Sequence, residues 1–441
     1  MTLQRIGSLT TRLVVAIGLA VSLGSCVSSR DSAYLVIRVI DQETRRGVPL
    51  VELTLPNQVK YWTDSAGVAV LDEPSLLGRD VFVTVESHGY EYPGETFLGT
   101  GVNVRFTPGH LEEIPIRRTM IAERLHRLTG EGIYRDSVMA GLPVPMAEPL
   151  LNAQVLGQDT VATAIYRGRL FWIWGDTIGP AYFNGSVSAA TSSLDDDPEV
   201  AINYRYFTDS EGRAKRMLPV TGSGLVWIEG LILLTDPEGR ERLVATYTRQ
   251  VGLTFPEECG LALFNDDEEV FEPWVRMNCT KPHRASHPVL HEGYWYLYPS
   301  LRVPNDWNAI QDPTRWEQRE VVLPPNAARD FPQGRISAVA WNEFRQRWIA
   351  LFENFGDVYY AEADRPEGPY GDAVQIVDHD RYNFYNVAMH PYFDRDGGRT
   401  IFLEGTYTDS FTDAPMKTPR YNYNQILYRL DLADPRLGAA R

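Results

Sequence analysis

Three observations predict an all-β protein with two domains, an N-terminal β-sandwich and a larger domain built from repeats. Short runs in which apolar and polar residues alternate recur along the chain between glycine-containing turns, as expected of strands with one buried face. In the second part of the chain, aromatic and β-branched runs return at intervals near 50 residues. With 441 residues, 44% of them hydrophobic, the chain can bury more than one core.

The composition argues against several classes of function. The chain carries 58 acidic and 42 basic residues, a formal net charge of −16, and no basic patch stands out. Because a nucleic-acid backbone repels such a surface, we expect no nucleic-acid partner. The sequence also lacks a P-loop, a dinucleotide-binding glycine pattern, zinc-ligand spacing and a Gly-x-Ser-x-Gly motif, so the chemistry that these motifs support is not predicted.

The N-terminus is typical of an export signal. Two arginines flank a polar stretch, and the apolar segment LVVAIGLAVSLGSC that follows is too short to span a bilayer. Its end resembles the lipobox of bacterial lipoproteins, which implies cleavage before Cys26 and lipidation of that cysteine. We therefore predict a lipoprotein signal peptide at residues 1–26, with a plain signal peptide as the alternative.

The predicted location is the cell envelope. In lipoproteins an aspartate after the lipidated cysteine favours the inner membrane, so Val27 points to the outer membrane. Contact with the membrane is expected through the lipid anchor only, because a net negative surface does not attract anionic lipid.

Two further cysteines, Cys259 and Cys279, bracket a predicted β-hairpin with an acidic turn, GLALFNDDEEVFEPWVRMN. Outside the cytoplasm a disulfide across the base of this hairpin is permitted. One sequence does not decide between a disulfide and two buried thiols.

Residues 31–120 are predicted to form a small β-sandwich, since AYLVIRVIDQETRRGVPLVELTL, GVAVL and DVFVTVESHGY have strand patterns joined by turns. The motifs VID at 39–41, GVPL at 47–50 and TDSAG at 63–67 resemble the transthyretin-like or carboxypeptidase-regulatory-like module. This resemblance covers about residues 33–118 and implies a stalk or spacer beside a catalytic domain.

A segment rich in glycine and proline follows the predicted sandwich and includes RLTGEGIYRDSVMAGLPVPMAEPLL. Such a composition favours extended and turn conformations. Residues 121–153 are therefore predicted to be a connecting strap.

Residues 154–441 are predicted to form a five-bladed β-propeller. The repeating runs are WIWGDT at 172, VATYTR at 244, WYLYPS at 295, WIALFEN at 348 and IFLEGT at 401. The last three intervals are 51, 53 and 53 residues, and the first interval of 72 contains an insertion. Each run follows a turn and an earlier strand, and a period near 50 built from short strands is typical of one four-stranded blade per repeat.

This architecture predicts a cluster of side chains at one mouth of the propeller. In each blade the start of the first strand and the end of the second strand lie on the same face. The predicted starts are Asp159, Ser223, His287, Ser337 and His390. The predicted ends are Asp176, Thr248, Ser300, Glu353 and Glu404.

Blade one carries the more specific signal. The motifs Gly157-x-Asp159, Gly168-Arg169 and Gly175-Asp176-Thr177 resemble the first blade of five-bladed glycoside hydrolase propellers, especially the family that includes bacterial endo-D-arabinanases. The resemblance extends to Asp159 and Asp176 alone, and implies that they act on a glycan.

The rest of the mouth departs from the better-known arabinanase and xylosidase propellers. Those propellers place acids on the inner strands of blades one, two and three, whereas this sequence has Ser223 and His287 at the expected second and third positions. His390 resembles a histidine that lies beside an axial calcium or water in many of those enzymes. The predicted chemistry requires no cofactor, and whether a metal is bound stays open.

The sequence thus predicts an exported glycoside hydrolase that acts on a polysaccharide or oligosaccharide. Asp159 is the predicted base or nucleophile, and Asp176 is the first candidate for the acid, before Glu404 and Glu353. His287, His390, Trp307, Trp316 and Tyr385 are predicted to contact the sugar.

Each of these residues also has an ordinary structural explanation. An aspartate can cap a turn, a His-Pro pair can lie at a strand edge, and loop aromatics can cover the core. The alternative function is a non-catalytic propeller that binds a polysaccharide or a protein.

Overall fold

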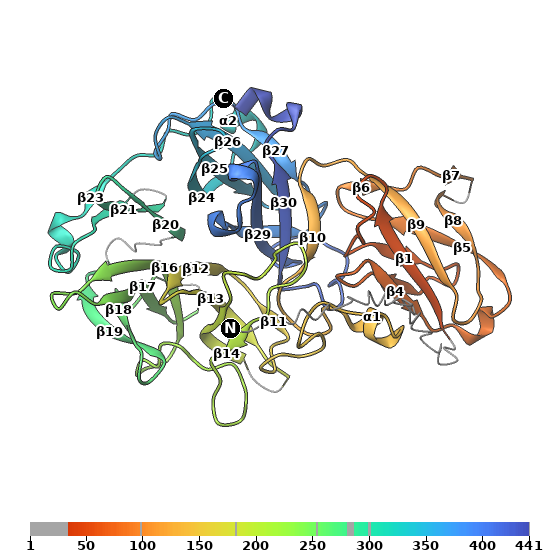
Figure 1. Cartoon of the computed structure of the whole chain (residues 1–441), viewed down its shortest axis with the longest axis horizontal. Coiled ribbons are helices and arrows are strands. Elements are labelled where there is room, and N and C mark those ends of the chain that lie inside the picture. The colour runs from red at the N-terminus through yellow and green to blue at the C-terminus, as the bar shows by residue number, and fades with distance from the viewer. Residues whose placement is uncertain are drawn as a thin grey trace, which may run out of the picture.

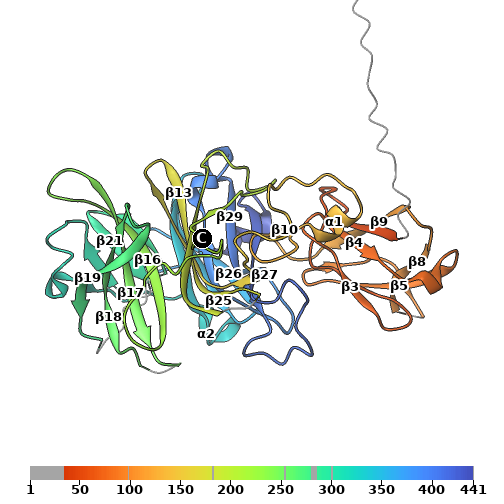
Figure 2. The same cartoon turned by 90° about the horizontal axis from the view of Figure 1, so that it is seen from below.

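The all-β prediction is confirmed by the structure, a computed structural model that describes residues 34–97, 99–180, 183–252, 255–279, 286–298 and 301–440. The predicted signal peptide, with Cys26, lies outside the described residues. Figures 1 and 2 show two parts of the molecule side by side, an N-terminal module and a larger group of sheets that forms a propeller-type fold. No helix among the described residues is long and apolar enough to cross a membrane.

The N-terminal module consists of two sheets that share a core. One sheet has the strand order β4-β1-β9-β6, and the other has the order β3-β2-β5-β8-β7. Alternate side chains of β5 are buried, as the apolar-polar alternation predicts. The strands are β1 (Leu35–Asp41), β2 (Glu52–Thr54), β3 (Lys60–Trp62), β4 (Val68–Leu71), β5 (Asp80–Glu86), β6 (Tyr90–Glu91), β7 (Glu95–Thr96), β8 (Gly99–Arg105) and β9 (Leu111–Arg118).

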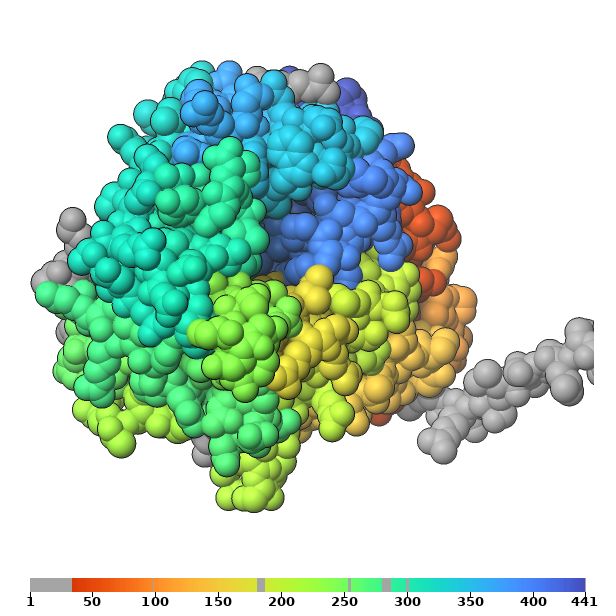
Figure 3. Space-filling model, turned by 60° about the vertical axis from the view of Figure 1, so that its left-hand side comes forward, coloured from red at the N-terminus to blue at the C-terminus, as the bar shows by residue number. Residues whose placement is uncertain are grey.

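The described part of the propeller contains five groups of antiparallel strands, and the sheets surround a central hollow in the space-filling view (Figure 3). The first two groups are joined by one parallel bridge between β14 and β16. The first contains β11 (Gly157–Gln158), β12 (Val161–Tyr166), β13 (Arg169–Ile178), β14 (Phe183–Ser192) and β15 (Arg205–Tyr206). The second contains β16 (Leu225–Thr235), β17 (Glu241–Gln250), β18 (Glu258–Asn265) and β19 (Val270–Met277).

The remaining groups continue around the hollow. The third contains β20 (Ser286–His291), β21 (Tyr294–Tyr298), β22 (Leu301–Pro304) and β23 (Glu317–Gln318). The fourth contains β24 (Arg335–Asn342), β25 (Arg347–Asn354), β26 (Asp357–Ala363) and β27 (Val374–Val377). The fifth contains β28 (Asn383–Met389), β29 (Thr400–Thr408), β30 (Asn424–Asp431) and β10 (Glu123–Arg127). Two short helices, α1 (Arg135–Met139) and α2 (Ala327–Asp330), lie in connecting segments.

The segment predicted as a strap also builds part of the propeller. Its strand β10 pairs antiparallel with β30, so the fifth sheet combines strands from before the first sheet and from the end of the chain. Arg429 of β30 contacts Glu123 of β10 with 2.6 Å between nitrogen and oxygen. The sequence prediction missed this role of the segment, because β30, the strand with which β10 pairs, lies about 300 residues further along the chain.

The N-terminal module packs directly on the propeller. One continuous hydrophobic core joins apolar side chains of the module to those of the fourth and fifth sheets. Tyr421, in the loop between β29 and β30, donates its hydroxyl to the carbonyl of Thr63 at 2.6 Å and accepts the backbone N–H of Leu50 at 3.1 Å. The module is therefore fixed to the loop that precedes β30.

Candidate active site

The innermost strands of the propeller share an irregularity near their starts. Register shifts interrupt the pairing of β16, β20, β24 and β28 with their neighbours, and a two-residue break separates β11 from β12. Thr160, His287 and Asn386 adopt positive φ angles at these points, which is uncommon for residues with a side chain. Such bulges redirect side chains, and strained backbone of this kind concentrates at functional sites.

Two of the predicted strand starts are wrong. In the fifth sheet the inner strand is β28, and His390 follows its end instead of opening it, because His390-Pro391 begins a 3₁₀ turn. Proline lacks the N–H that a central strand needs. In the second sheet β16 starts after Ser223, and the residue at its bulge is Glu229.

Asp159 is the centre of a hydrogen-bond cluster at the break between β11 and β12. Its Oδ1 accepts the backbone N–H of Asp176 at 2.8 Å. Its Oδ2 accepts the hydroxyls of Tyr385 at 2.7 Å and Tyr423 at 2.9 Å. Donors from two strands, β13 and β28, and from the loop before β30 therefore converge on this carboxyl group.

Gly175 allows Asp159 and Asp176 to approach each other. A Cβ atom at Gly175 would lie 2.4 Å from Oδ1 of Asp159, closer than any real Cβ contact. The glycine in the Gly-Asp-Thr motif is thus required by close approach of a side chain.

Asp176 lies beside Asp159 and has a different environment. Its Oδ1 accepts the indole N–H of Trp227 at 3.2 Å. Burial, followed by the negative charge of Asp159, raises the pKa of Asp176 to about 7. Burial also raises the pKa of Asp159, although the hydrogen bonds from Tyr385, Tyr423 and the Asp176 N–H oppose the shift. Two coupled carboxyl groups with raised pKa values are typical of acid–base sites.

Glu229 is a third carboxylate of this region that sequence reasoning missed. It stands two residues after Trp227 on β16, so both side chains leave the strand on the same face. The indole of Trp227 reaches Asp176, and Glu229 is partly exposed. The sequence contained one signal for Glu229, an acidic residue directly before Gly230 inside an apolar run. Glu229 gives the inner strand of the second sheet an acidic residue, which Ser223 at the predicted strand start did not.

Glu353, which was predicted as a catalytic candidate, has a structural role instead. Its Oε1 accepts Nε of Arg335 at 2.6 Å. Its Oε2 accepts the hydroxyl of Ser337 at 2.8 Å and the N–H of Val387 at 3.0 Å. Both oxygens are engaged, and they tie the fourth sheet to β28.

Glu404 and His390 are also corrected, because both side chains are fully buried. Nε2 of His390 lies 3.4 Å from Oε1 of Glu404, and Nδ1 of His390 contacts the hydroxyl of Tyr392 at 2.8 Å. His390 also packs against Trp172, with ring centroids 5.2 Å apart. The pair belongs to the core between the first and fifth sheets, where a sugar has no access.

His287 lies at the bulge of β20 with φ 37° and is partly exposed. Burial, and then the nearby His390, lowers the pKa of His287 to about 3, so its imidazole is uncharged at neutral pH. An uncharged imidazole can donate or accept a hydrogen bond with a sugar hydroxyl. Of the predicted sugar contacts, His287 and Tyr385 lie on inner strands, at or beside their bulges.

Trp307 and Trp316 are not part of this site, which corrects the prediction of sugar stacking. The ring of Trp307 packs on Trp274 with centroids 4.5 Å apart. The indole of Trp316 donates to the carbonyl of Ile310 at 2.9 Å. Both rings cover the core between the second and third sheets.

Cys259 and Cys279 form a disulfide, with Cα atoms 5.5 Å apart. Cys259 lies in β18, and Cys279 follows the end of β19, so the bond closes the hairpin of the second sheet. Among the described residues, no three His, Cys, Asp or Glu side chains gather as a metal site would require. Ser300, one of the predicted strand ends, lies outside the described residues.

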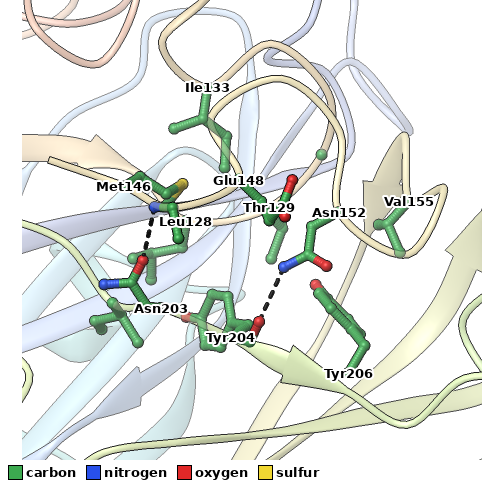
Figure 4. A pocket seen from close by; sticks show the side chains of 13 residues that line it. Leu128, Thr129, Ile133, Met146, Glu148, Asn152, Val155, Asn203, Tyr204 and Tyr206 are labelled. Carbon is green, nitrogen blue, oxygen red and sulfur yellow. Dashed lines mark hydrogen bonds between the residues drawn. The ribbon is translucent and has the colours of Figure 1, made fainter. Parts of the chain in front are cut away.

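A small cavity lies apart from Asp159, between the segment after β10 and the segment before β15 (Figure 4). Leu128, Ile133 and Tyr204 contribute to its lining, and its volume is about 40 Å³. Asn152 donates to the carbonyl of Tyr204 at its edge, at 2.9 Å. The space suits a few water molecules rather than a sugar.

No protein-family model and no curated protein matches the chain. Solved structures resemble it at low identity. A protein assigned as an exo-β-1,3-galactanase from Bifidobacterium bifidum is 10% identical, with a TM-score of 0.43, over 71% of this chain and 94% of that chain. The α-L-arabinanase from Penicillium chrysogenum is 11% identical, with a TM-score of 0.37, over 64% and 96%.

The GH43_1 enzyme from Xanthomonas citri is 11% identical, with a TM-score of 0.41, over 64% of this chain and 88% of that chain. TM-scores below 0.5 at such identities do not establish a family. The function proposed below rests on the geometry of the site.

Proposed function

We propose that this chain is a glycoside hydrolase in which Asp159 and Asp176 are the catalytic carboxyl groups. The observation that carries the proposal is the contrast between these two neighbours. Asp159 accepts three hydrogen bonds, whereas Asp176 accepts one from Trp227 and has a pKa of about 7. Two neighbouring carboxyl groups that differ in hydrogen bonding, one of which keeps its proton near neutral pH, are the parts that glycoside hydrolysis needs.

Asp176 is the general acid of this mechanism. With a pKa of about 7 it keeps its proton near neutral pH and can deliver it to the glycosidic oxygen as the bond breaks. The indole N–H of Trp227 holds one of its oxygens, which orients the carboxyl group.

Asp159 is the base or the nucleophile. Both of its oxygens accept hydrogen bonds, and these bonds stabilise the ionised form of Asp159. An equally buried carboxyl group without such donors would ionise less readily. In the base role Asp159 takes a proton from the water that attacks the anomeric carbon, and in the nucleophile role it attacks that carbon itself. Burial keeps the pKa values of Tyr385 and Tyr423 above their ordinary range, so both remain protonated donors to Asp159.

We also propose the finer organisation that the sequence predicts. The five groups of strands are five blades, and the N-terminal module is a transthyretin-like sandwich. The chain is exported as a lipoprotein anchored through Cys26, at the outer membrane, where it meets its polysaccharide. Replacement of Cys26 by serine tests the anchor. The variant is expected in the soluble fraction. Equal amounts of variant and parent in the membrane fraction would contradict lipidation.

The hydrolase proposal is tested with Asp159→Asn and Asp176→Asn. We expect each variant to lower the release of reducing ends from the polysaccharide that the parent cleaves by at least 10²-fold, about the contribution of a general acid or base, and to fold like the parent. D-arabinan, L-arabinan, β-1,3-galactan and xylan form the panel. If both variants fold and keep full activity, Asp159 and Asp176 are not the catalytic pair. A parent that binds but cleaves none of these polymers supports the alternative, a binding propeller.

A further inference from the structure

Two neighbouring cavities, each of about 480 Å³, share part of their lining: the first lies between the fourth and fifth sheets, and the second lies where the fifth sheet meets the N-terminal module. Both are lined by Asp378, Asp380, Arg381 and Tyr382, in the segment before β28. The first reaches the turn between β25 and β26, and the second reaches β3 of the module. We call these two cavities together the rim groove.

Two exposed phenylalanines line the first cavity. Phe355, in the turn between β25 and β26, is 54% exposed, and Phe411, after β29, is 81% exposed. Both have positive φ angles, 56° and 61°, which are unfavourable for a bulky side chain. Neither ring belongs to a hydrophobic core of the described residues. Contact of both rings with a ligand explains their exposure and their positive φ angles together.

The second cavity has aromatic side chains and an uncharged histidine in its wall, beside acidic and basic residues. Tyr382 stacks on Tyr407 with centroids 4.8 Å apart and 19° between the planes. Nε2 of His88 lies 3.2 Å from the hydroxyl of Tyr407, and burial lowers the pKa of His88 to about 3, so that the ring is uncharged. Trp62 of β3 also lines this cavity.

The polar groups of the groove suit hydroxyls of a neutral ligand. Asn354 lines the first cavity, and its buried Oδ1 has no hydrogen-bond partner among the described residues. The carboxylates of Asp378 and Asp380 are exposed acceptors in both cavities. Acids outnumber bases in the lining, which disfavours an anionic ligand such as a phosphate. Aromatic faces beside carboxylate and amide groups can bind the apolar face and the hydroxyls of a sugar.

The rim groove is connected to the candidate active site through two segments. Tyr382 in the groove is three residues before Tyr385, which donates to Asp159. The loop between β29 and β30 carries Phe411 at its beginning and Tyr423, the second donor to Asp159, at its end. A polymer in the groove therefore lies next to the segments that reach the carboxyl pair.

We propose that the rim groove is a second glycan-binding site, which holds a neutral stretch of the same polysaccharide several sugar units away from the bond at Asp159. The proposal rests on the proposed function for its choice of ligand. It assigns to the N-terminal module, through Trp62 and His88, a wall of a binding site in addition to the role of a spacer.

The test uses the full mature chain with Asp176→Asn, so that binding is measured without hydrolysis. Native gels that contain D-arabinan, L-arabinan, β-1,3-galactan or xylan report affinity as retardation. In this background the double substitution Phe355→Ala and Phe411→Ala is expected to weaken binding about tenfold, from two lost aromatic contacts. The matched control is Phe344→Ala, at a 44% exposed phenylalanine in the turn between β24 and β25, which should leave retardation unchanged.

A second pair of measurements separates binding from folding and from catalysis. Phe355→Gly relieves the unfavourable φ angle, so it should keep or raise the melting temperature while it weakens binding. With Asp176 restored, the Phe355→Ala and Phe411→Ala enzyme should lose about tenfold in kcat/KM on the polymer and keep its kcat/KM on a disaccharide aryl glycoside.

Equal retardation of the double variant and its parent overturns the proposal, and so does a parent that none of the four polymers retards. If Asp176→Asn still cleaves the polymer, the proposed function fails, and the retardation of the Phe355 and Phe411 variants still decides the fate of the groove.

Discussion

The hydroxyl of Tyr423 donates to Oδ2 of Asp159 across 2.9 Å, although 264 residues separate the two in the chain. Tyr423 has a φ angle of 62°, unfavourable for a tyrosine, and its backbone is held by a hydrogen bond from its N–H to the carbonyl of Tyr407 at 2.7 Å. Two residues earlier, Tyr421 is anchored on Thr63 of the N-terminal module. The module thus helps to fix the loop that brings a donor to the central carboxylate.

The first prediction concerns this donor. In Tyr423→Phe the ionised form of Asp159 loses one hydrogen bond, which raises the pKa of this carboxyl group further. Because Asp159 must be ionised to act, the acidic limb of kcat/KM should move to higher pH, and kcat should fall about tenfold, the size of one lost hydrogen bond to a charged group. The pH profile measures both effects.

The matched control for this prediction is Tyr166→Phe. The hydroxyl of Tyr166, the last residue of β12, also donates to a carboxylate, that of Asp266 in the turn between β18 and β19. Its loss should leave the profile of activity against pH unchanged. An unshifted acidic limb in Tyr423→Phe would show that this hydrogen bond does not tune Asp159.

The second prediction concerns Asp176. The acid must be protonated, and the pKa of Asp176 is about 7, so activity should fall above pH 7. Since the charge of Asp159 contributes to this shift, Asp159→Asn should lower the pKa of Asp176. A carbon-13 titration of the aspartate carboxyls in the parent and in Asp159→Asn measures the change directly, and equal midpoints would contradict the coupling.

The same raised pKa has a consequence for stability. A buried acid with a raised pKa is penalised in the folded state once it ionises, so stability falls as the pH rises from about 4 to about 7. Asp176→Asn removes this penalty. Its melting temperature should exceed that of the parent at pH 8 and approach it at pH 4, as a thermal scan at the two pH values would show. A variant that is less stable than the parent at pH 8 would identify Asp176 as a structural turn residue.

The parts of this architecture that sequence could predict are the local ones. The period near 50 residues and the alternation of apolar side chains reflect the geometry of single strands and hairpins, and Gly175-Asp176 follows from a close approach inside one sheet. The contacts of Tyr423 and the pairing of β10 with β30 depend on residues hundreds of positions away, and no local pattern encodes them.

The errors have equally specific causes. His390 is predicted to open a strand, but β28 ends at Met389 and Pro391 begins a 3₁₀ turn, because proline lacks the N–H that a central strand needs. Glu353 and Glu404 are candidates because, like Asp176, they are predicted at the ends of second strands. In the structure Glu353 accepts hydrogen bonds from Arg335 and Ser337, and Glu404 is fully buried in a core. Burial and hydrogen-bond partners, which a single sequence does not show, distinguish these carboxylates from Asp176.

A further prediction tests the close approach at Gly175. In Gly175→Ala the new Cβ would lie 2.4 Å from Oδ1 of Asp159, so the carboxyl group must rotate or shift. Because a displacement of about 1 Å at a reacting group costs on the order of 10²-fold in rate, kcat should fall by about that factor. The φ angle of Gly175 is not positive, so the fold should persist, and circular dichroism is the control. Retained activity would show that Asp159 is not held where catalysis requires it.

The last prediction contrasts a structural with a catalytic carboxylate. Glu353 accepts hydrogen bonds from Arg335, Ser337 and the N–H of Val387, and its side chain is almost fully buried. In Glu353→Gln one acceptor oxygen becomes an NH₂ group that faces donors, and the charge of Arg335 loses its partner. The free energy of unfolding should therefore fall by about 2 kcal/mol, the cost of an unsatisfied buried polar group, while kcat at 20 °C stays within about twofold because Glu353 does not contact Asp159 or Asp176. Asp176→Asn should show the opposite combination, a large loss of kcat with no loss of stability at neutral pH. Urea unfolding and polysaccharide hydrolysis on the same preparations compare the two variants. A Glu353→Gln protein that is stable but inactive would move the catalytic acid to the fourth sheet.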